Sequence, residues 1–166
     1  MYSIHRNETR GGIMKDYIKM NIQRLMSQKG LNSVSLSEKS QISRQTISKI
    51  LDMSSTNYNP NFSTIYTLAQ TLGVTIPTLL SRVEISDMEK KEILPKEEYI
   101  DILNGNFKKA LQGKKQKAAS VEPGLSESVI SKLWNNINSN PNFTTIESIS
   151  EITGIDIGKL FIRGEE

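Results

Sequence analysis

The chain has 166 residues, no cysteine, a single histidine and a formal net charge of +3. The absence of cysteine excludes disulfides and thiolate metal sites, and it fits a reducing cytoplasm. No apolar run approaches the roughly 20 residues of a membrane span, so we expect no membrane partner. The only histidine, His5, precedes the first periodic segment. A Ser-His or Cys-His nucleophile is therefore not expected, and we predict a protein that is not an enzyme and holds no metal or cofactor.

Two stretches of the sequence occur twice. Residues 43–49 (SRQTISK) are echoed by 126–132 (SESVISK), and residues 59–65 (NPNFSTI) return as 140–146 (NPNFTTI). Such a repeat indicates two copies of one folding unit. We therefore predict two domains with a preceding arm and a charged linker: a flexible arm at 1–13, a first unit at 14–82, a linker at 83–95 and a second unit at 96–166.

Apolar residues recur at three- and four-residue spacing through both units, and no alternating β pattern competes, which predicts an all-α fold. In the first unit we expect five helices, over residues 16–30, 34–40, 43–53, 62–72 and 76–81. In the second unit we expect helices over residues 97–112, 116–121, 126–135, 143–153 and 157–162. Asn32 or Ser33 can cap the second helix, and the Ser43 side chain can accept hydrogen bonds from first-turn amides of the third.

A short helix, a tight turn and a second Ser-capped helix make a helix-turn-helix, which lays its second helix in the major groove of DNA. The ordered set of residues resembles the Cro/repressor-type (XRE) helix-turn-helix family in both units. In the first unit the resemblance rests on Leu36-Ser37, Ile42-Ser43, Ile47-Ser48-Lys49, Pro60, Leu68-Ala69 and Leu72-Gly73-Val74. In the second it rests on Ala119-Ser120, Gly124-Leu125-Ser126, Ile130-Ser131-Lys132-Leu133, Pro141 and Gly154-Ile155. The resemblance implies tandem five-helix, lambda-repressor-like domains.

This family reads bases with the outer face at the start of the third helix. Carried over, that face consists of Ser43, Arg44, Gln45, Ser48 and Lys49. The chemistry agrees, because Gln45 can pair bidentately with adenine, and Arg44 or Lys49 can pair with guanine. A solvated helix face also favours Arg, Gln and Lys, so that alternative stays open. The first unit carries eight Lys/Arg against three Asp/Glu over residues 15–82, which suits a polyanion.

The resemblance also implies contacts to the DNA backbone. Asn61 and Phe62 occupy the place where the family's fourth helix points its amide end at phosphate. A simpler alternative makes Asn61 an N-cap and Phe62 a core residue. Both roles can also hold together, with the phenyl ring inward and the amides outward. Gln116 stands at the family's usual glutamine position, within a patch of lysines. This patch either contacts phosphate or is an ordinary solvent-exposed surface. The expected backbone contacts are Ser33, Asn61, Phe62, Lys114, Lys115, Gln116 and Lys117.

The second unit departs from the first in its reading face. The equivalent residues are Ser126, Glu127, Ser128, Ser131 and Lys132, a less basic set in which Glu127 can accept from a cytosine amino group. Leu51 and Trp134 stand at equivalent places where the family often has a polar residue. They either pack locally or bury an interface between the units or between chains.

We therefore predict a cytoplasmic bacterial or phage regulator, most simply a repressor, that binds double-stranded DNA sequence-specifically with the first unit as its main reader. Two linked heads of one chain, or a homodimer, would contact half-sites about one helical turn apart. An antitoxin-like interaction module is the alternative, in which one helix-turn-helix unit, expected to be the second, binds a protein partner. An RNA-associated role is a further alternative.

Overall fold

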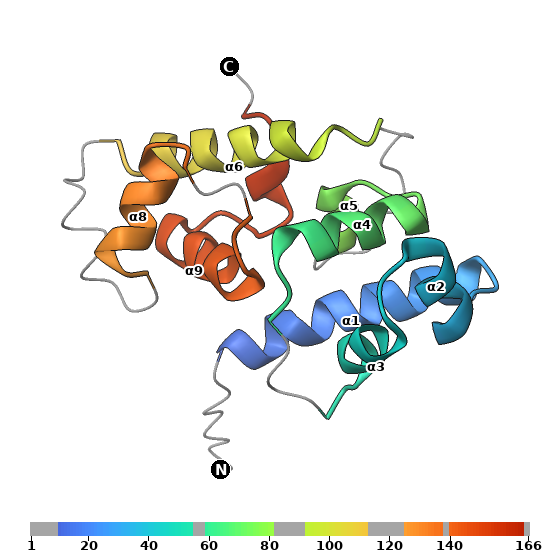
Figure 1. The fold of residues 1–166 in the computed structure, drawn as a ribbon. Helices are drawn as coiled ribbons and strands as arrows, with labels where there is room; N and C mark the ends of the chain where they lie inside the picture. Colours follow the sequence, from blue (N-terminus) through green and yellow to red (C-terminus); the bar gives the residue numbers. More distant parts are fainter. Residues whose placement is uncertain (1–9, 55–58, 82–91, 113–124, 138–139, 165–166) are drawn as a thin grey trace, which may run out of the picture.

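The computed structural model describes residues 10–54, 59–81, 92–112, 125–137 and 140–164 (Figure 1). Within these ranges the chain is helical and has no strand, so the predicted all-α fold is confirmed. The helices of the first unit are α1 (Arg10–Gln28), α2 (Ser33–Ser40), α3 (Arg44–Leu51), α4 (Phe62–Leu72) and α5 (Ile76–Leu80). Those of the second unit are α6 (Lys96–Ala110), α8 (Glu127–Trp134), α9 (Phe143–Thr153) and the 3-10 helix η1 (Lys159–Phe161).

Most predicted helices differ from the observed ones by one or two residues at an end, and the first and the last differ most. The helix α1 begins at Arg10, six residues before the predicted start at Asp16, so residues 10–13 of the expected arm are helical. Hydrophobic periodicity marks only the part of a helix that touches a core, and the pattern is silent over the added turn. The helix expected over 157–162 is a single 3-10 turn. The helix expected over 116–121 lies outside the described residues.

The helix ends follow the expected chemistry. Ser43 caps α3, its Oγ accepting a hydrogen bond from the Thr46 amide at 3.1 Å. Asn32, rather than Ser33, caps α2, and it forms a reciprocal capping box with Ser35. The equivalent helices α4 and α9 both have 11 residues and both end at a glycine in the left-handed conformation, at Gly73 and Gly154.

Buried side chains of both units form one continuous hydrophobic core. The helix α1 contacts α3, α4 and α5, and α6 contacts α8, α9 and η1. Figure 1 shows α4 beside α1 in the first unit, and α8 and α9 on one side of α6 in the second. Between these two sets, the ring of Phe62 in α4 stacks on Phe161 of η1, with centroids 5.3 Å apart, and Tyr66 of α4 meets Tyr99 of α6 edge-on. The helix α1 also contacts α9, and α5 contacts η1. The two units are therefore packed against each other through apolar side chains.

Candidate nucleic-acid interface

The helix α3 presents one apolar and one polar face. Ile47 and Ile50, three residues apart, are fully buried and fix the helix to the core. The five predicted base-reading residues all lie on the exposed side: Ser43, Arg44, Gln45, Ser48 and Lys49. Residues three and four apart share one face of a helix, so burial of the isoleucines turns these polar side chains outward together. The structure thus brings the predicted reading residues to one accessible face.

Side chains of α1 hold the carboxyl end of α3. The Nζ of Lys19, a residue only 1% exposed, donates to the Asp52 carbonyl at 2.7 Å. Gln23 Nε2 donates to the Leu51 carbonyl at 3.4 Å. An ammonium at the carboxyl end of a helix satisfies open carbonyls and complements the helix dipole. Sequence reasoning missed Lys19, because a lysine on a helix reads as an exposed residue unless the position of its carbonyl partner is known.

The turn between α2 and α3 is closed by side-chain hydrogen bonds. Ser37 Oγ donates to the Ile42 carbonyl at 2.6 Å, and Ser40 Oγ accepts from the Ile42 amide at 3.2 Å. Gln41 takes the left-handed conformation (φ +58°), which reverses the chain between the two helices. The geometry of the helix-turn-helix is therefore fixed by local polar contacts as well as by the core.

A depression of about 350 Å³ separates the start of α2 from the exposed side of α3. It is lined by Ser33, Val34, Arg44, Ser48, Leu51 and Asp52. Ser33, predicted to contact the DNA backbone, therefore lies beside two of the predicted base-reading residues. Arg44 pairs with Glu38 at 3.6 Å, and both side chains are more than 60% exposed, so this ion pair is weak and can yield to another anion.

The structure places Leu51 and Trp134 against the core. Leu51 is half-buried at the end of α3 and packs on the hydrophobic cluster. Trp134 is half-buried at the end of α8, and its ring meets Phe107 of α6 edge-on, with centroids 6.5 Å apart. Both side chains thus have local packing partners, which is one of the two roles expected from the sequence.

The helix α8 repeats the form of α3. It also has eight residues, and Ser126 Oγ caps it by accepting from the Val129 amide at 3.3 Å. Ile130 and Leu133 point into the core. Of the predicted second reading face, Ser131 is half-buried and the other four are exposed: Ser126, Glu127, Ser128 and Lys132. The lysine patch with Lys114, Lys115, Gln116 and Lys117 lies outside the described residues.

The amide end of α4 faces the second unit. The Phe62 side chain is fully buried, and its amide donates to the Pro141 carbonyl at 2.8 Å. Asn61 Oδ1 accepts from the Thr64 amide at 3.0 Å and so caps its own helix. In this conformation Asn61 is an N-cap and Phe62 a core residue, as in the simpler alternative. A phosphate contact of Phe62 does not fit this arrangement, because the ring is enclosed and the amide is already bonded.

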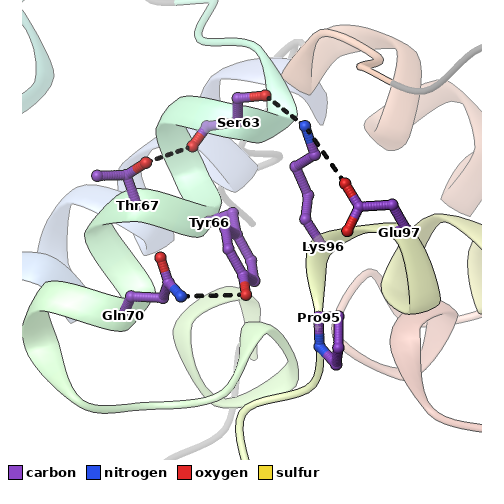
Figure 2. A pocket seen from close by; sticks show the side chains of 7 residues that line it. All are labelled: Ser63, Tyr66, Thr67, Gln70, Pro95, Lys96 and Glu97. Carbon is purple, nitrogen blue, oxygen red and sulfur yellow. Dashed lines mark hydrogen bonds and ion pairs between the residues drawn. The ribbon is translucent and has the colours of Figure 1, made fainter.

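A second depression, of about 400 Å³, lies between α4 and the start of α6 (Figure 2). Its polar side chains bond to neighbours across the junction of the units. Tyr66 OH donates to the Leu94 carbonyl at 3.1 Å and accepts from Gln70 Nε2 at 3.1 Å. Lys96 Nζ lies 3.5 Å from Ser63 Oγ. This depression is therefore part of the joint between the first unit and α6.

Along the described part of the chain, no helix is long and apolar enough to cross a membrane. The same part contains no group of three His, Asp or Glu side chains placed to hold a metal ion.

Residues 21–84 match a family described as the Cro/C1-type HTH DNA-binding domain. The match covers the last part of α1 and all of α2 to α5, and so includes the helix-turn-helix and the exposed face of α3. It does not extend to the second unit, so a second tandem copy stays a prediction. No curated protein and no solved structure matches the sequence. The helix-turn-helix part of the chain, residues 21–84, is therefore similar to Cro/C1-type HTH DNA-binding domains.

Proposed function

We propose that the protein regulates transcription, as a repressor, by binding a specific double-stranded DNA sequence through α3. One observation carries the proposal: five polar side chains share the exposed face of α3, while Ile47 and Ile50 lock that helix into the core. A rigid helix with a continuous hydrophilic face can enter the major groove without disturbing its own packing.

The chemistry of this face divides into reading and positioning. The guanidinium of Arg44 fits the two acceptors of guanine, and the amide of Gln45 fits the donor and acceptor of adenine. Ser43, Ser48 and Lys49 complete the reading face. Ser33, at the start of α2, can contact phosphate through its hydroxyl and the helix amides. Eight basic against three acidic residues over 15–82 add a sequence-independent attraction to the DNA backbone. Occupation of the groove at a promoter would then exclude the polymerase.

Selection of bound sequences from a random duplex pool, with the full chain, tests the proposal directly. We expect one motif to be enriched, and its affinity to fall steeply with salt, because each released phosphate contact contributes about one to the slope of log affinity against log salt. An Arg44→Ala variant should lose the preference at a guanine in that motif. Equal binding of all duplexes, or no binding even at low salt, would refute sequence-specific recognition.

A protein-binding role for the second unit is the alternative function. Ile137, three residues beyond Trp134, is 66% exposed, and a partner could cover it. A single exposed apolar side chain is ordinary on a protein surface, so this observation carries less than the face of α3. Because Trp134 is the only tryptophan, its fluorescence separates the two roles. A blue shift with a protein partner and none with DNA would favour the interaction module.

A further inference from the structure

The two copies of the Asn-Pro-Asn-Phe segment bind each other. The Phe62 amide donates to the Pro141 carbonyl at 2.8 Å, and the Phe143 amide donates to the Pro60 carbonyl at 2.8 Å. These bonds form an antiparallel bridge in which Asn61 faces Asn142. Each bond is the counterpart of the other, since the partners stand 81 positions apart in the repeat.

Side chains extend this reciprocity. Asn140 Oδ1 accepts from the Ser63 amide at 2.8 Å, and Asn59 Oδ1 accepts from the Thr144 amide at 3.1 Å. Each unit therefore caps the first turn of the other unit's helix, α4 or α9. We name residues 59–63 with 140–144 the clasp. Four first-turn amides that α4 and α9 would otherwise offer to solvent or to phosphate are paired within the clasp.

Equivalent elements meet elsewhere in the same way. The helix α5 contacts η1, which holds the equivalent place in the second unit. The contact of α1 with α9 has a counterpart between α6 and α4, because Lys96 at the start of α6 lies against Ser63 of α4 (Figure 2). An interface is two-fold when each of its contacts occurs twice. Position i of the first copy then contacts position j of the second, and position j of the first contacts position i of the second.

Each unit also has the same internal brace. Asn21 Nδ2 of α1 donates to the Leu79 and Ser81 carbonyls at 2.9 and 2.8 Å. Asn106 Nδ2 of α6 donates to the Leu160 and Ile162 carbonyls at 3.0 and 2.8 Å. The brace ties the first helix of each unit to the end of its last one. The elements that meet at the pseudo-two-fold interface are therefore held alike on both sides.

We propose that the chain is a pseudo-two-fold pair within one polypeptide, and that one chain binds one DNA site whose two half-sites differ in sequence. The inference rests on the proposed function and specifies the kind of DNA site that the protein binds. In a two-fold DNA-binding dimer, the two reading helices contact half-sites about one helical turn apart. Here the clasp joins the unit that carries α3 to the unit that carries α8 inside one chain. The proposal requires that the clasp hold the two reading helices at that spacing.

The half-sites differ because the two reading faces differ. Arg44 of α3 corresponds to Glu127 of α8, and Gln45 corresponds to Ser128. A guanidinium suits guanine, whereas a carboxylate suits the amino group of cytosine. All four side chains are exposed on their helices. A palindrome built from either half-site would therefore satisfy one helix and mismatch the other.

The test uses the full chain and the motif selected from the random pool. Three duplexes are compared: the selected site, a palindrome of its first half and a palindrome of its second half. We expect the selected site to bind about 10- to 100-fold more tightly than either palindrome, as for one or two mismatched base pairs. The mass of the complex should correspond to one chain per duplex. Two chains per duplex, or a motif with a single half, would overturn the inference.

A double variant makes the test sharper. Glu127→Arg with Ser128→Gln gives α8 the side chains of α3 at these two positions, so preference should shift to the palindrome of the first half. Glu151→Arg, an exposed position on α9, changes the charge equally and should leave the preference unchanged. An unchanged preference in the double variant would remove α8 from the reading surface. No binding of any duplex by the parent chain would instead refute the proposed function itself.

The clasp predicts a fixed spacing. Insertion of five base pairs between the halves turns one half-site to the opposite side of the duplex, and we expect affinity to fall about 10- to 100-fold. Asn59→Ala with Asn140→Ala removes both caps that cross the clasp, and it should reduce this penalty while the preference for each half remains. Equal affinity of the parent chain for both spacings would show that the clasp does not set the distance.

Discussion

At the scale of single residues, Gln45 is the most direct test of base reading. Its side chain is exposed in the first turn of α3. We expect Gln45→Ala to relax the preference at one base pair by about 1–3 kcal/mol, because a bidentate contact with adenine is lost. Most of the non-specific affinity should remain, since phosphate contacts are untouched.

The measurement is the affinity of the variant for duplexes changed at one base pair at a time. Gln28→Ala is the matched control, because Gln28 is an exposed glutamine at the end of α1. The control should keep the full preference at every position. If Gln45→Ala also keeps it, Gln45 does not touch a base.

At the residue level, prediction from sequence succeeded where the helical period determines which side of a helix a side chain faces. The outward position of Arg44 and Gln45 follows from the inward position of Ile47 and Ile50, and the structure has both. Prediction from sequence was incomplete where a hydrogen-bond partner distant in the sequence determines whether a side chain is buried. Lys19 is buried because a carbonyl 33 residues away accepts from it, and no local pattern announces that partner.

At the scale of the helix, the cap of α3 supports the reading face. Ser43 Oγ accepts from the Thr46 amide and lies 2.9 Å from Thr46 Oγ1. We expect Ser43→Ala to lower the free energy of unfolding by about 1 kcal/mol, because a first-turn amide loses its acceptor. Ser43→Asn keeps an acceptor and should cost only a few tenths of that. Urea unfolding of both variants measures the difference, and equal losses would mean that the cap does not stabilise α3.

Tyr99 of α6 lies where α5, η1 and the end of the linker meet, and it gives this junction a pH dependence. Burial raises the pKa of its hydroxyl above the usual 10.0, against a smaller opposite effect of hydrogen bonds with the backbone of Leu94 and Ile76. The unfolded chain then loses this proton first as pH rises. The stability that this group contributes is complete below pH 10 and is lost as pH rises above 10 towards the folded pKa.

We therefore expect the free energy of unfolding to fall above pH 10 less steeply in Tyr99→Phe than in the parent chain. Denaturant unfolding at several pH values, with tyrosinate absorbance as a second readout, measures this slope. Tyr17→Phe removes the hydroxyl of a half-buried residue in α1 and serves as the control. An identical slope in the Tyr99 variant would show that this hydroxyl ionises equally in both states.

Helix existence was predictable and helix ends only partly so. The bounds of α4 and α9 agree with the prediction, because an asparagine before and a glycine after mark them. The early start of α1 was not predictable, since its first turns carry no apolar period. The final turn, η1, is shorter than predicted. Asp156 Oδ1 accepts from the Gly158 amide at 3.0 Å, directly before the start of this turn.

At the scale of the whole molecule, the repeat was visible in the sequence but the meeting of its copies was not. Asn61 and Phe62 fit equally well as a phosphate site and as a capped, buried helix start. In the structure, residues of the second copy occupy this helix start: Pro141 accepts from the Phe62 amide, and Asn140, 77 residues from Ser63, accepts from the Ser63 amide. Pairing between residues so far apart leaves no periodic pattern in the sequence. The sequence of each copy is the same whether that copy binds the other copy or DNA.

The contact between α5 and η1 makes a prediction about how tightly the units are joined. A Cβ on Gly158 would lie 3.0 Å from the Pro77 carbonyl oxygen and 3.3 Å from the Ser81 Cα, both backbone atoms. We expect Gly158→Ala to lower the free energy of unfolding by about 1–3 kcal/mol, because α5 or η1 must move to make room.

Gly105→Ala is the matched control within α6, where an added Cβ meets nothing within 4 Å. It should raise the free energy of unfolding by about 1 kcal/mol, since alanine favours the helix over glycine. Gly158 itself has helical dihedral angles (φ −68°, ψ −36°), so without the contact its substitution by alanine would also stabilise the fold. Opposite signs in the two variants, measured by urea unfolding, therefore report the closeness of α5 and η1. The same sign in both would mean that the units part readily at this contact and that the clasp alone holds them in register.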